Sequence, residues 1–398
     1  MLFMNATRQG LTPALVMLMS VATGLCVASN YYVQPLLNTI AQQFDLSVSL
    51  AGFIVTTAQL GYACGLLLLV PLGDRFERRS LIVTMILLAA AGMVIIALSH
   101  TFLFLLLGTV MTGLFSVAAQ ILVPLAATLA EPERRGKIVG TVMSGLLLGI
   151  LLARTVAGGL AQLGGWRTVY WTASLLMVIM ALALWRSLPR VKQSVPMSYP
   201  QLLASIFRLY AGNRVIRTRA WTGCLSFANF SLLWTSMAFL LSGAPYHFSE
   251  GKIGLLGLVG AAGALAARQA GSLADKGKAK LTTRLGLLLM LLSWAAIAWG
   301  AEQLAPLIVG ILLLDLAVQA VHITNQSVIY AQMPEARNRL NAGYMTSYFI
   351  GGAAGSLLSA TAYHLAGWYG VCIAGAVLTL VNLLIWAGGS RFEPENIT

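Results

Sequence analysis

The stretch LAPLIVGILLLDLAVQAVHITNQSVIY, residues 304–330, is long enough and apolar enough to cross a lipid bilayer as one α-helix. An α-helix needs about 20 predominantly apolar residues to span the hydrocarbon core. The stretch holds one acidic residue, Asp315, near its middle. A carboxylate at bilayer depth is costly and usually serves a function, so Asp315 is the first candidate functional residue of the chain.

The composition of the whole chain supports the same class of protein. Of 398 residues, 58% are hydrophobic and only 9% are charged, which leaves too little polar surface for a soluble globular protein. The sequence therefore predicts an all-α membrane protein. We expect twelve transmembrane helices, at residues 11–38, 49–72, 80–99, 102–129, 138–162, 168–185, 220–243, 252–273, 283–300, 305–330, 341–365 and 368–387.

The net charge of +13 is explained by membrane topology. A nucleic-acid-binding surface gathers Lys and Arg on one soluble face, whereas here they lie in short loops on alternate sides of the predicted helices. If the N-terminus is cytoplasmic, the outer loops hold only Arg167 and Lys252, and the other loop cations lie inside. Positive loops favour the cytoplasm. We therefore expect a multi-pass protein of the cell inner (plasma) membrane, with both termini cytoplasmic and no nucleic-acid partner.

The first apolar stretch has a competing interpretation, a secretory signal peptide, because Val27-Ala28-Ser29 resembles a cleavage site. We expect the helix to be retained, since its basic region is only Arg8. The four cysteines lie inside apolar stretches without paired spacing, so we expect small core residues and neither metal nor other cofactor. They are Cys26, Cys64, Cys224 and Cys372. No nucleophile–base spacing or phosphate-binding loop occurs, so an enzyme is not expected.

The chain contains an internal repeat with an offset of about 200 residues. Three pairs of segments match in register: 72–75 with 273–276, 132–135 with 334–337, and 165–166 with 367–368. Each pair occupies the same place in a set of six predicted helices. The repeat therefore predicts two six-helix bundles, at residues 1–185 and 220–398, joined by a basic cytoplasmic linker at residues 186–219.

The linker carries seven basic residues and no acidic residue. Pro189, Pro196 and Pro200 break any continuous helix in its first part. From Gln201 to Tyr210, apolar residues recur at helical spacing. This part is either a helix that lies on the anionic inner leaflet or a plain loop, and the sequence leaves both open.

The loop after the second predicted helix, PLGDRFERR at residues 71–79, resembles the loop signature of the major facilitator superfamily. The segment GSLADK at residues 271–276 resembles its second copy. With the helix count, the repeat and the linker, the whole chain resembles the twelve-helix, drug/proton antiporter-like branch of that family. The resemblance implies two pseudo-symmetric bundles and a gate formed by Asp74, Arg75, Arg78, Arg79, Asp275 and Lys276. Alternatively, the arginines of the loop only fix the topology.

The fifth predicted helix carries a glycine series that resembles the antiporter motif of this family and so implies export. Its members are Gly140, Gly145, Gly149, Gly158 and Gly159. Arg154 lies about two-thirds of the way along this helix, in the Ala153-Arg154 pair that replaces the Gly-Pro of the motif. Arg154 either binds an anionic group or an acid, or it extends to the outer interface with a structural role.

Polar side chains share one face of the tenth predicted helix. Asp315, Gln319, His322 and Gln326 are spaced i, i+4, i+7 and i+11, and such a face turns to protein or water. A carboxyl group in a site of low dielectric constant and a histidine can both exchange protons near neutral pH. We therefore expect Asp315 and His322 to couple the protein to protons. The alternative is a hydrogen-bond cluster that only holds helices together.

In the family, the first, fourth, seventh and tenth helices line a central cavity, so the resemblance implies substrate contacts from these helices. The candidates are Asn30, Tyr31, Gln34, Gln120, Asn229, Phe230, Trp234, Gln319 and Gln326, with Arg154 from the fifth helix. Aromatic and amide groups without a cluster of arginines favour an apolar or amphipathic organic solute.

These features predict a secondary active transporter that works by alternating access, and proton-coupled efflux is favoured. A proton-coupled importer of a metabolite is the alternative, and a membrane receptor that does not transport is a weaker one. The expected partners are a small-molecule substrate, protons and the lipid bilayer, and we expect a monomer.

Overall fold

The computed structural model describes residues 11–131, 134–191, 198–266, 277–333 and 336–393. Within these ranges the chain is built from helices and short connections, without strands. The first five helices and the turns between them are α1 (Pro13–Ala28), η1 (Gln34–Leu36), α2 (Leu37–Gln43), α3 (Val48–Leu68), η2 (Val70–Asp74), α4 (Arg78–Leu98) and α5 (Phe102–Phe115). They are followed by η3 (Ser116–Ala118), α6 (Ala119–Leu129), α7 (Arg135–Gly164) and α8 (Trp166–Ser187). After the connecting helix α9 (Tyr199–Gly212) come α10 (Arg214–Ser242), α11 (Glu250–Ala266), α13 (Ala279–Trp299), α14 (Leu304–Gln332), α15 (Arg337–Gly389) and η6 (Ser390–Phe392).

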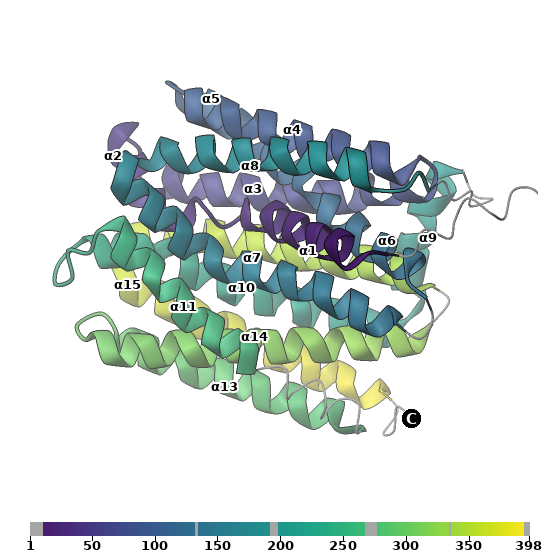
Figure 1. The fold of residues 1–398 in the computed structure, drawn as a ribbon. Coiled ribbons are helices and arrows are strands. Elements are labelled where there is room, and N and C mark those ends of the chain that lie inside the picture. Colours follow the sequence, from purple (N-terminus) through teal and green to yellow (C-terminus); the bar gives the residue numbers. More distant parts are fainter. Residues whose placement is uncertain (1–10, 132–133, 192–197, 267–276, 334–335, 394–398) are drawn as a thin grey trace, which may run out of the picture.

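The long helices lie roughly side by side in one bundle (Figure 1). Nine helices of the described ranges are long and apolar enough to cross a membrane. One of them, α15, is two helices divided by non-helical backbone at Ala366 and Gly367. With this division, and with the shorter helices α1 and α11, the bundle agrees with the predicted twelve spans.

Both copies of the third repeat anchor have the same backbone feature. Gly165 and Gly367 have positive φ, 82° and 61°, a region that glycine enters without steric cost. The tryptophans that follow, Trp166 and Trp368, are both buried and both donate a hydrogen bond through Nε1, to Gln43 and to the carbonyl of Ile297. The other two anchors lie partly outside the described residues.

The first apolar stretch is not one continuous helix, contrary to the prediction for residues 11–38. The helix α1 ends at Ala28, a turn follows, and Pro35 is the second residue of the 3-10 turn η1. Proline lacks the N–H that a continuing α-helix needs at this position. Every residue from Ser29 to Leu37 is buried. Irregular backbone at membrane depth is tolerated where protein surrounds it, and here it places Gln34 in the interior.

Small residues bring the N-terminal helices α1–α8 and the C-terminal helices α10–α15 together. A methyl group added at Gly158 of α7 would lie 2.3 Å from the carbonyl oxygen of Glu250 and 3.2 Å from the Cα of Gly254 in α11. One added at Gly52 of α3 would lie 2.2 Å from the Cβ of Ala360 in α15. Because such approaches leave no room for side chains, the backbones of these helices pack directly.

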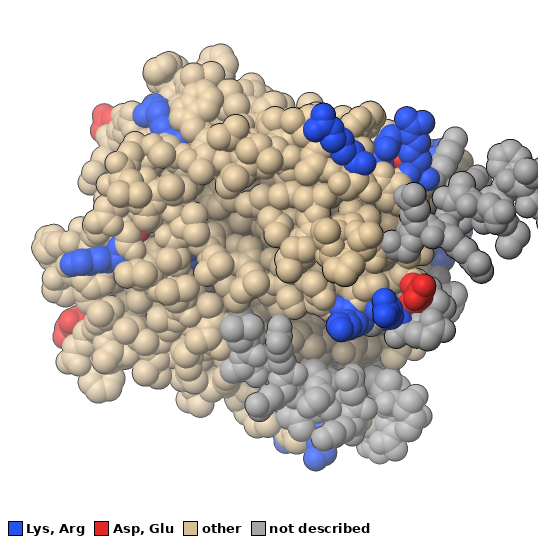
Figure 2. All heavy atoms as spheres, viewed as in Figure 1, with Lys and Arg blue, Asp and Glu red and all other residues tan. Residues whose placement is uncertain are grey.

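The side surface of the bundle is apolar. In Figure 2, Lys, Arg, Asp and Glu lie mostly toward the two ends, and a wide band of uncharged residues lies between them. Large hydrophobic side chains such as Leu148, Leu292 and Ile373 are exposed. A lipid bilayer covers such a surface without the penalty that water would impose. Cys64 is also exposed, so it is not the core residue that the sequence predicts, whereas the other three cysteines are buried.

The connecting segment contains a helix, so a plain loop at residues 201–210 was the wrong alternative. Ser198 and Gln201 form a reciprocal capping box at the start of α9. The hydroxyl of Tyr199 donates to the carbonyl of Leu68 in α3, and that of Tyr210 donates to the carbonyl of Leu340 in α15. The helix thus bridges N-terminal and C-terminal helices. The next helix, α10, begins at Arg214, within the stretch expected to be linker.

Candidate functional site

A buried cluster of polar and charged side chains lies where the N-terminal and C-terminal helices meet. Its centre is Trp234 of α10, which two charged residues approach. The indole Nε1 donates a hydrogen bond to Oδ1 of Asp315 in α14, at 3.3 Å. The guanidinium of Arg154 in α7 lies over the same ring system, 4.0 Å from its centroid. Opposite charges from the two sets of helices therefore meet on one side chain.

Asp315 fits this place because α11 has no side chain there. A methyl group in place of the Gly260 hydrogen would lie 2.1 Å from Oδ2 of Asp315 and 2.9 Å from the Trp234 ring. Only glycine leaves the carboxyl group this space. Asp315 is 3% exposed, and its hydrogen-bond partner is Trp234, not His322. The role of Gly260 could not be predicted, since the contact joins helices distant in the chain.

Arg154 is also 3% exposed, so it does not extend to an interface. Its Nε donates to Oε1 of Gln34 at 2.6 Å. The rings of Tyr31 and Phe230, at 4.9 and 5.2 Å from the guanidinium carbon, complete an aromatic enclosure with Trp234. A cation held over aromatic faces is stabilised by the ring quadrupoles.

Two donors of this cluster are buried without a partner in the structure. They are Nη2 of Arg154 and Nε2 of Gln34, both N–H groups. The packing around Gln34, Arg154, Trp234 and Met237 leaves a gap too small for a water molecule in this conformation. Because buried donors are normally hydrogen-bonded, this pair is suited to an acceptor oxygen brought in by a ligand. The side-chain Oδ1 of Asn30, an acceptor, is also buried without a partner.

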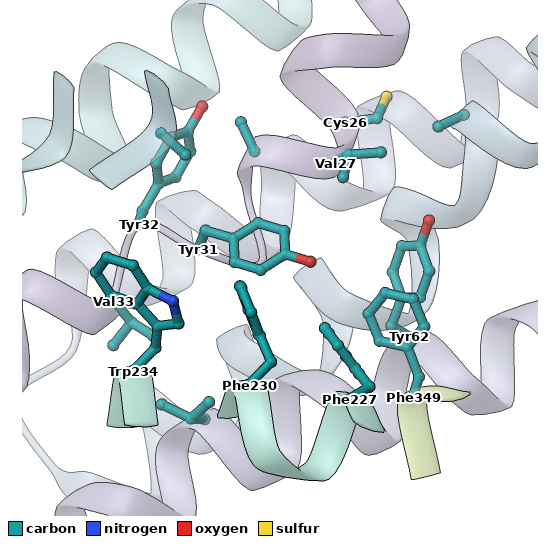
Figure 3. Packing of buried hydrophobic residues seen from close by; sticks show 14 of the residues in the cluster. Cys26, Val27, Tyr31, Tyr32, Val33, Tyr62, Phe227, Phe230, Trp234 and Phe349 are labelled. Carbon is teal, nitrogen blue, oxygen red and sulfur yellow. The ribbon is translucent and has the colours of Figure 1, made fainter. Parts of the chain in front are cut away.

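An aromatic wall continues from the cluster along α10. Phe227 and Phe230 are stacked with ring centroids 5.3 Å apart, and Tyr31 meets Phe230 edge-on at 6.4 Å. Figure 3 shows Tyr31 above these two rings, with Trp234 at one end and the Tyr62–Phe349 pair at the other. The wall offers a flat apolar surface beside the polar cluster.

His322 lies in a separate group of residues, although it shares a helix face with Asp315. Its Nδ1 is 3.1 Å from the hydroxyl of Tyr344 in α15, and its ring lies 4.5 Å from that of Tyr348. Asn325 donates to the same Tyr344 hydroxyl at 3.4 Å. The two residues expected to exchange protons therefore have different partners.

The remaining four amide candidates lie in four different places. Gln120 donates to the hydroxyl of Tyr62 at 3.3 Å, and Gln326 donates to Asn341 at 3.5 Å. Gln319 is half-buried on α14 between Asp315 and His322. Asn229 is not part of the central cluster: its Oδ1 accepts from Trp294 and Thr379, inside the C-terminal helices.

The predicted gate residues differ in their surroundings. Arg78 is buried and donates to the carbonyl of Gly73 and to the hydroxyl of Thr128. Arg79 lies over the ring of Trp185, 4.6 Å from its centroid, while Arg75 is exposed. The side chain of Asp74 and both Asp275 and Lys276 lie outside the described part of the chain. A pocket of about 50 Å³ next to this loop is lined by residues of α3, η2, α4, α6, α9 and α15.

Three glycines of the α7 series serve close helix packing. Methyl groups at Gly145 and Gly149 would lie 2.2 Å from carbonyl oxygens of α1, and Gly158 meets α11. Gly140 and Gly159 have open space beside them. The series therefore packs α7 against both sets of helices.

Comparison with known proteins agrees with this architecture. The model of the Major Facilitator Superfamily matches residues 19–313 and 221–397. An uncharacterized transporter, YgaY, of Escherichia coli O157:H7 is 67% identical over 394 residues, covering 99% of this chain and all of the relative. A probable transporter of Streptomyces coelicolor, SCO4007, is 33% identical and covers 91% of this chain and 85% of its own length.

A solved structure has the same fold. It is the inward-facing, occupied form of a bacterial homolog to the human lysosomal transporter Spinster, with a TM-score of 0.79, 16% identity and coverage of 96% of this chain and 98% of that chain. The likeness at this identity concerns the fold. Together, the helical bundle, the family match over most of the residues and the transporter relatives identify the chain as a multi-pass membrane transporter, not an enzyme, that belongs to the major facilitator superfamily.

Proposed function

We propose that the protein exports a small amphipathic organic solute from the cell by proton-coupled alternating access. The observation that carries this proposal is the shared contact of Arg154 and Asp315 with Trp234. Arg154 belongs to the N-terminal helices, whereas Trp234 and Asp315 belong to the C-terminal helices. A rocking motion of one set against the other changes this contact, so the charge of Asp315 and the conformation depend on each other.

In this mechanism Asp315 is the proton carrier. The guanidinium attracts the ionised carboxylate while both lie against Trp234, and the attraction is strong because the site is dry. When the two sets of helices separate, Asp315 loses this compensation and accepts a proton. His322, in contact with Tyr344 and Tyr348, is the proposed second proton group of the pathway.

The proposed solute binds between the unpartnered donors and the aromatic wall. Nη2 of Arg154 and Nε2 of Gln34 provide hydrogen bonds to an acceptor oxygen, and the rings of Tyr31, Phe230 and Trp234 provide apolar contact. Such a site recognises an amphipathic molecule better than a strongly charged one, because Asp315 already balances the charge of Arg154.

The direction of transport rests on the α7 glycine series and on the charge balance. An uncharged solute that binds best when Asp315 is ionised competes with the proton for the site. Because the two bind alternately, solute and proton cross the membrane in opposite directions. The unpartnered donors of Arg154 and Gln34 favour a second candidate, import of an organic anion. An anion near Asp315 binds better when the carboxyl group is protonated, so it and the proton would move together.

The same mechanism assigns roles to the other predicted parts. Residues 1–185 and 220–398 are the proposed rocking units. The loops that hold Asp74, Arg75, Arg78 and Arg79 and, in the second copy, Asp275 and Lys276 are the proposed gates on the cytoplasmic side. We place both termini in the cytoplasm and the protein, as a monomer, in the inner membrane.

The test is the accumulation of a panel of lipophilic dyes and antimicrobials in cells with no protein, the native chain, Asp315→Asn or Asp45→Asn. Asp45 is a matched control, because it is exposed and its φ of 51° suits asparagine. We expect the native chain and D45N to lower accumulation, and D315N or a protonophore to abolish the effect. Normal export by D315N contradicts proton coupling through this residue. Higher accumulation with the native chain favours import.

A further inference from the structure

A second buried charge pair lies away from the central cluster, where the segment after α15 meets the C-terminal helices. Arg219, near the start of α10, is fully buried. Its Nε and Nη2 donate to the two carboxylate oxygens of Glu393 at 2.7 and 2.6 Å. Such a bidentate pair is strong and fixes the orientation of both groups. Sequence analysis placed Arg219 in the linker, so the pair was missed.

The remaining nitrogen of Arg219 joins two other helices. Nη1 donates to the hydroxyl of Thr283 in α13 at 2.6 Å and to Oδ1 of Asn325 in α14 at 3.0 Å. The segment that carries Glu393 is held further by the Arg214 guanidinium, which lies 3.7 Å from the centroid of the Phe392 ring. Glu393 is therefore the counter-charge for a cation surrounded by three helices.

The contacts continue from Arg219 to the candidate proton group. Asn325 accepts from Arg219 through its oxygen and donates through its nitrogen to the Tyr344 hydroxyl, at 3.4 Å. The same hydroxyl is 3.1 Å from Nδ1 of His322. An amide has one acceptor end and one donor end, so the guanidinium determines which end of Asn325 faces Tyr344.

We propose that Glu393 is a positioning residue of the transport pathway, which sets the place of His322 through Arg219, Asn325 and Tyr344. Without its carboxylate, Arg219 becomes an uncompensated buried cation. Water entry or a turn of Asn325 toward Arg219 relieves that cost, and either change releases the Tyr344 hydroxyl. The C-terminal segment thus controls a group deep in the bundle that it does not touch.

The test follows the reactivity of His322 in the purified full-length protein. The chain has four histidines, and the other three, His100, His247 and His364, are exposed and serve as internal references. Modification by diethyl pyrocarbonate is followed at each histidine by mass spectrometry. In Glu393→Gln we expect His322 to react about tenfold faster relative to the references, because the local structure around it opens more often.

Two further variants test whether the effect of Glu393 on His322 passes through Tyr344. Tyr344→Phe removes the hydroxyl that contacts His322 and is expected to raise the same rate, and the double variant is expected to add little, since both changes break one chain of contacts. Glu302→Gln, at an exposed glutamate, is the matched control and is expected to leave all four rates unchanged.

An unchanged His322 rate in Glu393→Gln overturns the proposal. So does an equal rise at all four histidines, which would show that the pair only stabilises the fold. If Glu393→Gln does not fold, Asn325→Leu removes the link between Arg219 and the Tyr344 hydroxyl, and an unchanged His322 rate there has the same meaning. The measurement needs no solute, so it can fail while proton-coupled export stands, and it can succeed if export is wrong.

Discussion

Arg154 and Asp315 contact the same indole, that of Trp234, from different parts of the chain. The guanidinium of Arg154 lies over the ring, and the carboxylate of Asp315 accepts a hydrogen bond from the indole N–H. One charge comes from the N-terminal helices and the other from the C-terminal helices. The surroundings of each charged residue therefore depend on the position of the opposite set of helices. Coupling of a proton to alternating access requires such a dependence.

Because Gly260 leaves room for the Asp315 carboxyl group, we expect a larger residue at position 260 to impair transport. Gly260→Ala places a methyl group against Oδ2 of Asp315, so the carboxyl group must move and its hydrogen bond to Trp234 is lost. We expect export to fall by about tenfold or more, because removal of such a charge-assisted contact costs about 1.5–3 kcal/mol. Gly159→Ala, which meets open space, is the control and should export normally. Equal export by the two variants would contradict the placement of Asp315.

The shape of the Arg154 side chain matters as well as its charge. Arg154→Lys keeps the charge but loses the planar contact with Trp234 and the bond from Nε to Gln34. We expect export of a dye identified in the panel to fall by about tenfold or more. Arg167 stacks on Trp166 at 4.4 Å, and Arg167→Lys supplies a matched change away from the site. A fully active Arg154→Lys would show that only the charge is used.

Asn229 separates packing from transport. Asn229→Ala leaves the Trp294 N–H and the Thr379 hydroxyl without their acceptor in the interior of the C-terminal helices. We expect the free energy of unfolding to fall by about 1–3 kcal/mol. Thermal unfolding in detergent measures the loss, with Asn38→Ala, at a half-buried asparagine of α2, as the control. Export per folded molecule should stay normal, and a selective loss of export would instead place Asn229 in the substrate cavity.

The start of α4 depends on Glu77, which lies between two membrane-spanning helices. Burial alone would raise the pKa of Glu77, but hydrogen bonds from Ser80 and Arg79 and the Arg79 charge hold it below the ordinary value. A lowered pKa means that the stabilisation is present at neutral pH and is lost as the pH falls through the folded-state pKa. We expect Glu77→Ala to lower stability by about 1 kcal/mol at pH 7, and less in acid. A difference that grows in acid would contradict this sign.

Much of the fold could be predicted because a membrane helix shows itself locally, as a long apolar run. The turns at Gly165 and Gly367 could be predicted as equivalent positions, because the same Gly-Trp pair occurs in both halves of the repeat. The break after Ala28 was not predicted, since Asn30 and Gln34 were interpreted as polar residues of a continuous cavity-lining helix and only Pro35 marks the break. The helix α9 could be recognised as a possible helix, but its bonds to Leu68 and Leu340 join distant parts of the chain.

The site was predicted less completely, because its geometry depends on contacts between helices. Asp315 and Arg154 were recognisable as costly charges in apolar stretches. Their common contact with Trp234 was not, and the shared helix face of Asp315 and His322 suggested a pair that the structure separates. The polar contacts of Arg219 could not be predicted from the sequence. Next to a basic linker, a further arginine looks like one of the loop cations that set the membrane topology.

Proton exchange at Asp315 can be measured directly in purified protein. A solute from the cellular panel is added to weakly buffered native protein, Asp315→Asn and Asp45→Asn, and the pH change is recorded. We predict proton release on binding by the native protein and by D45N, and none by D315N. Release that persists in D315N, or the absence of any proton exchange in the native protein despite solute binding, would contradict the account.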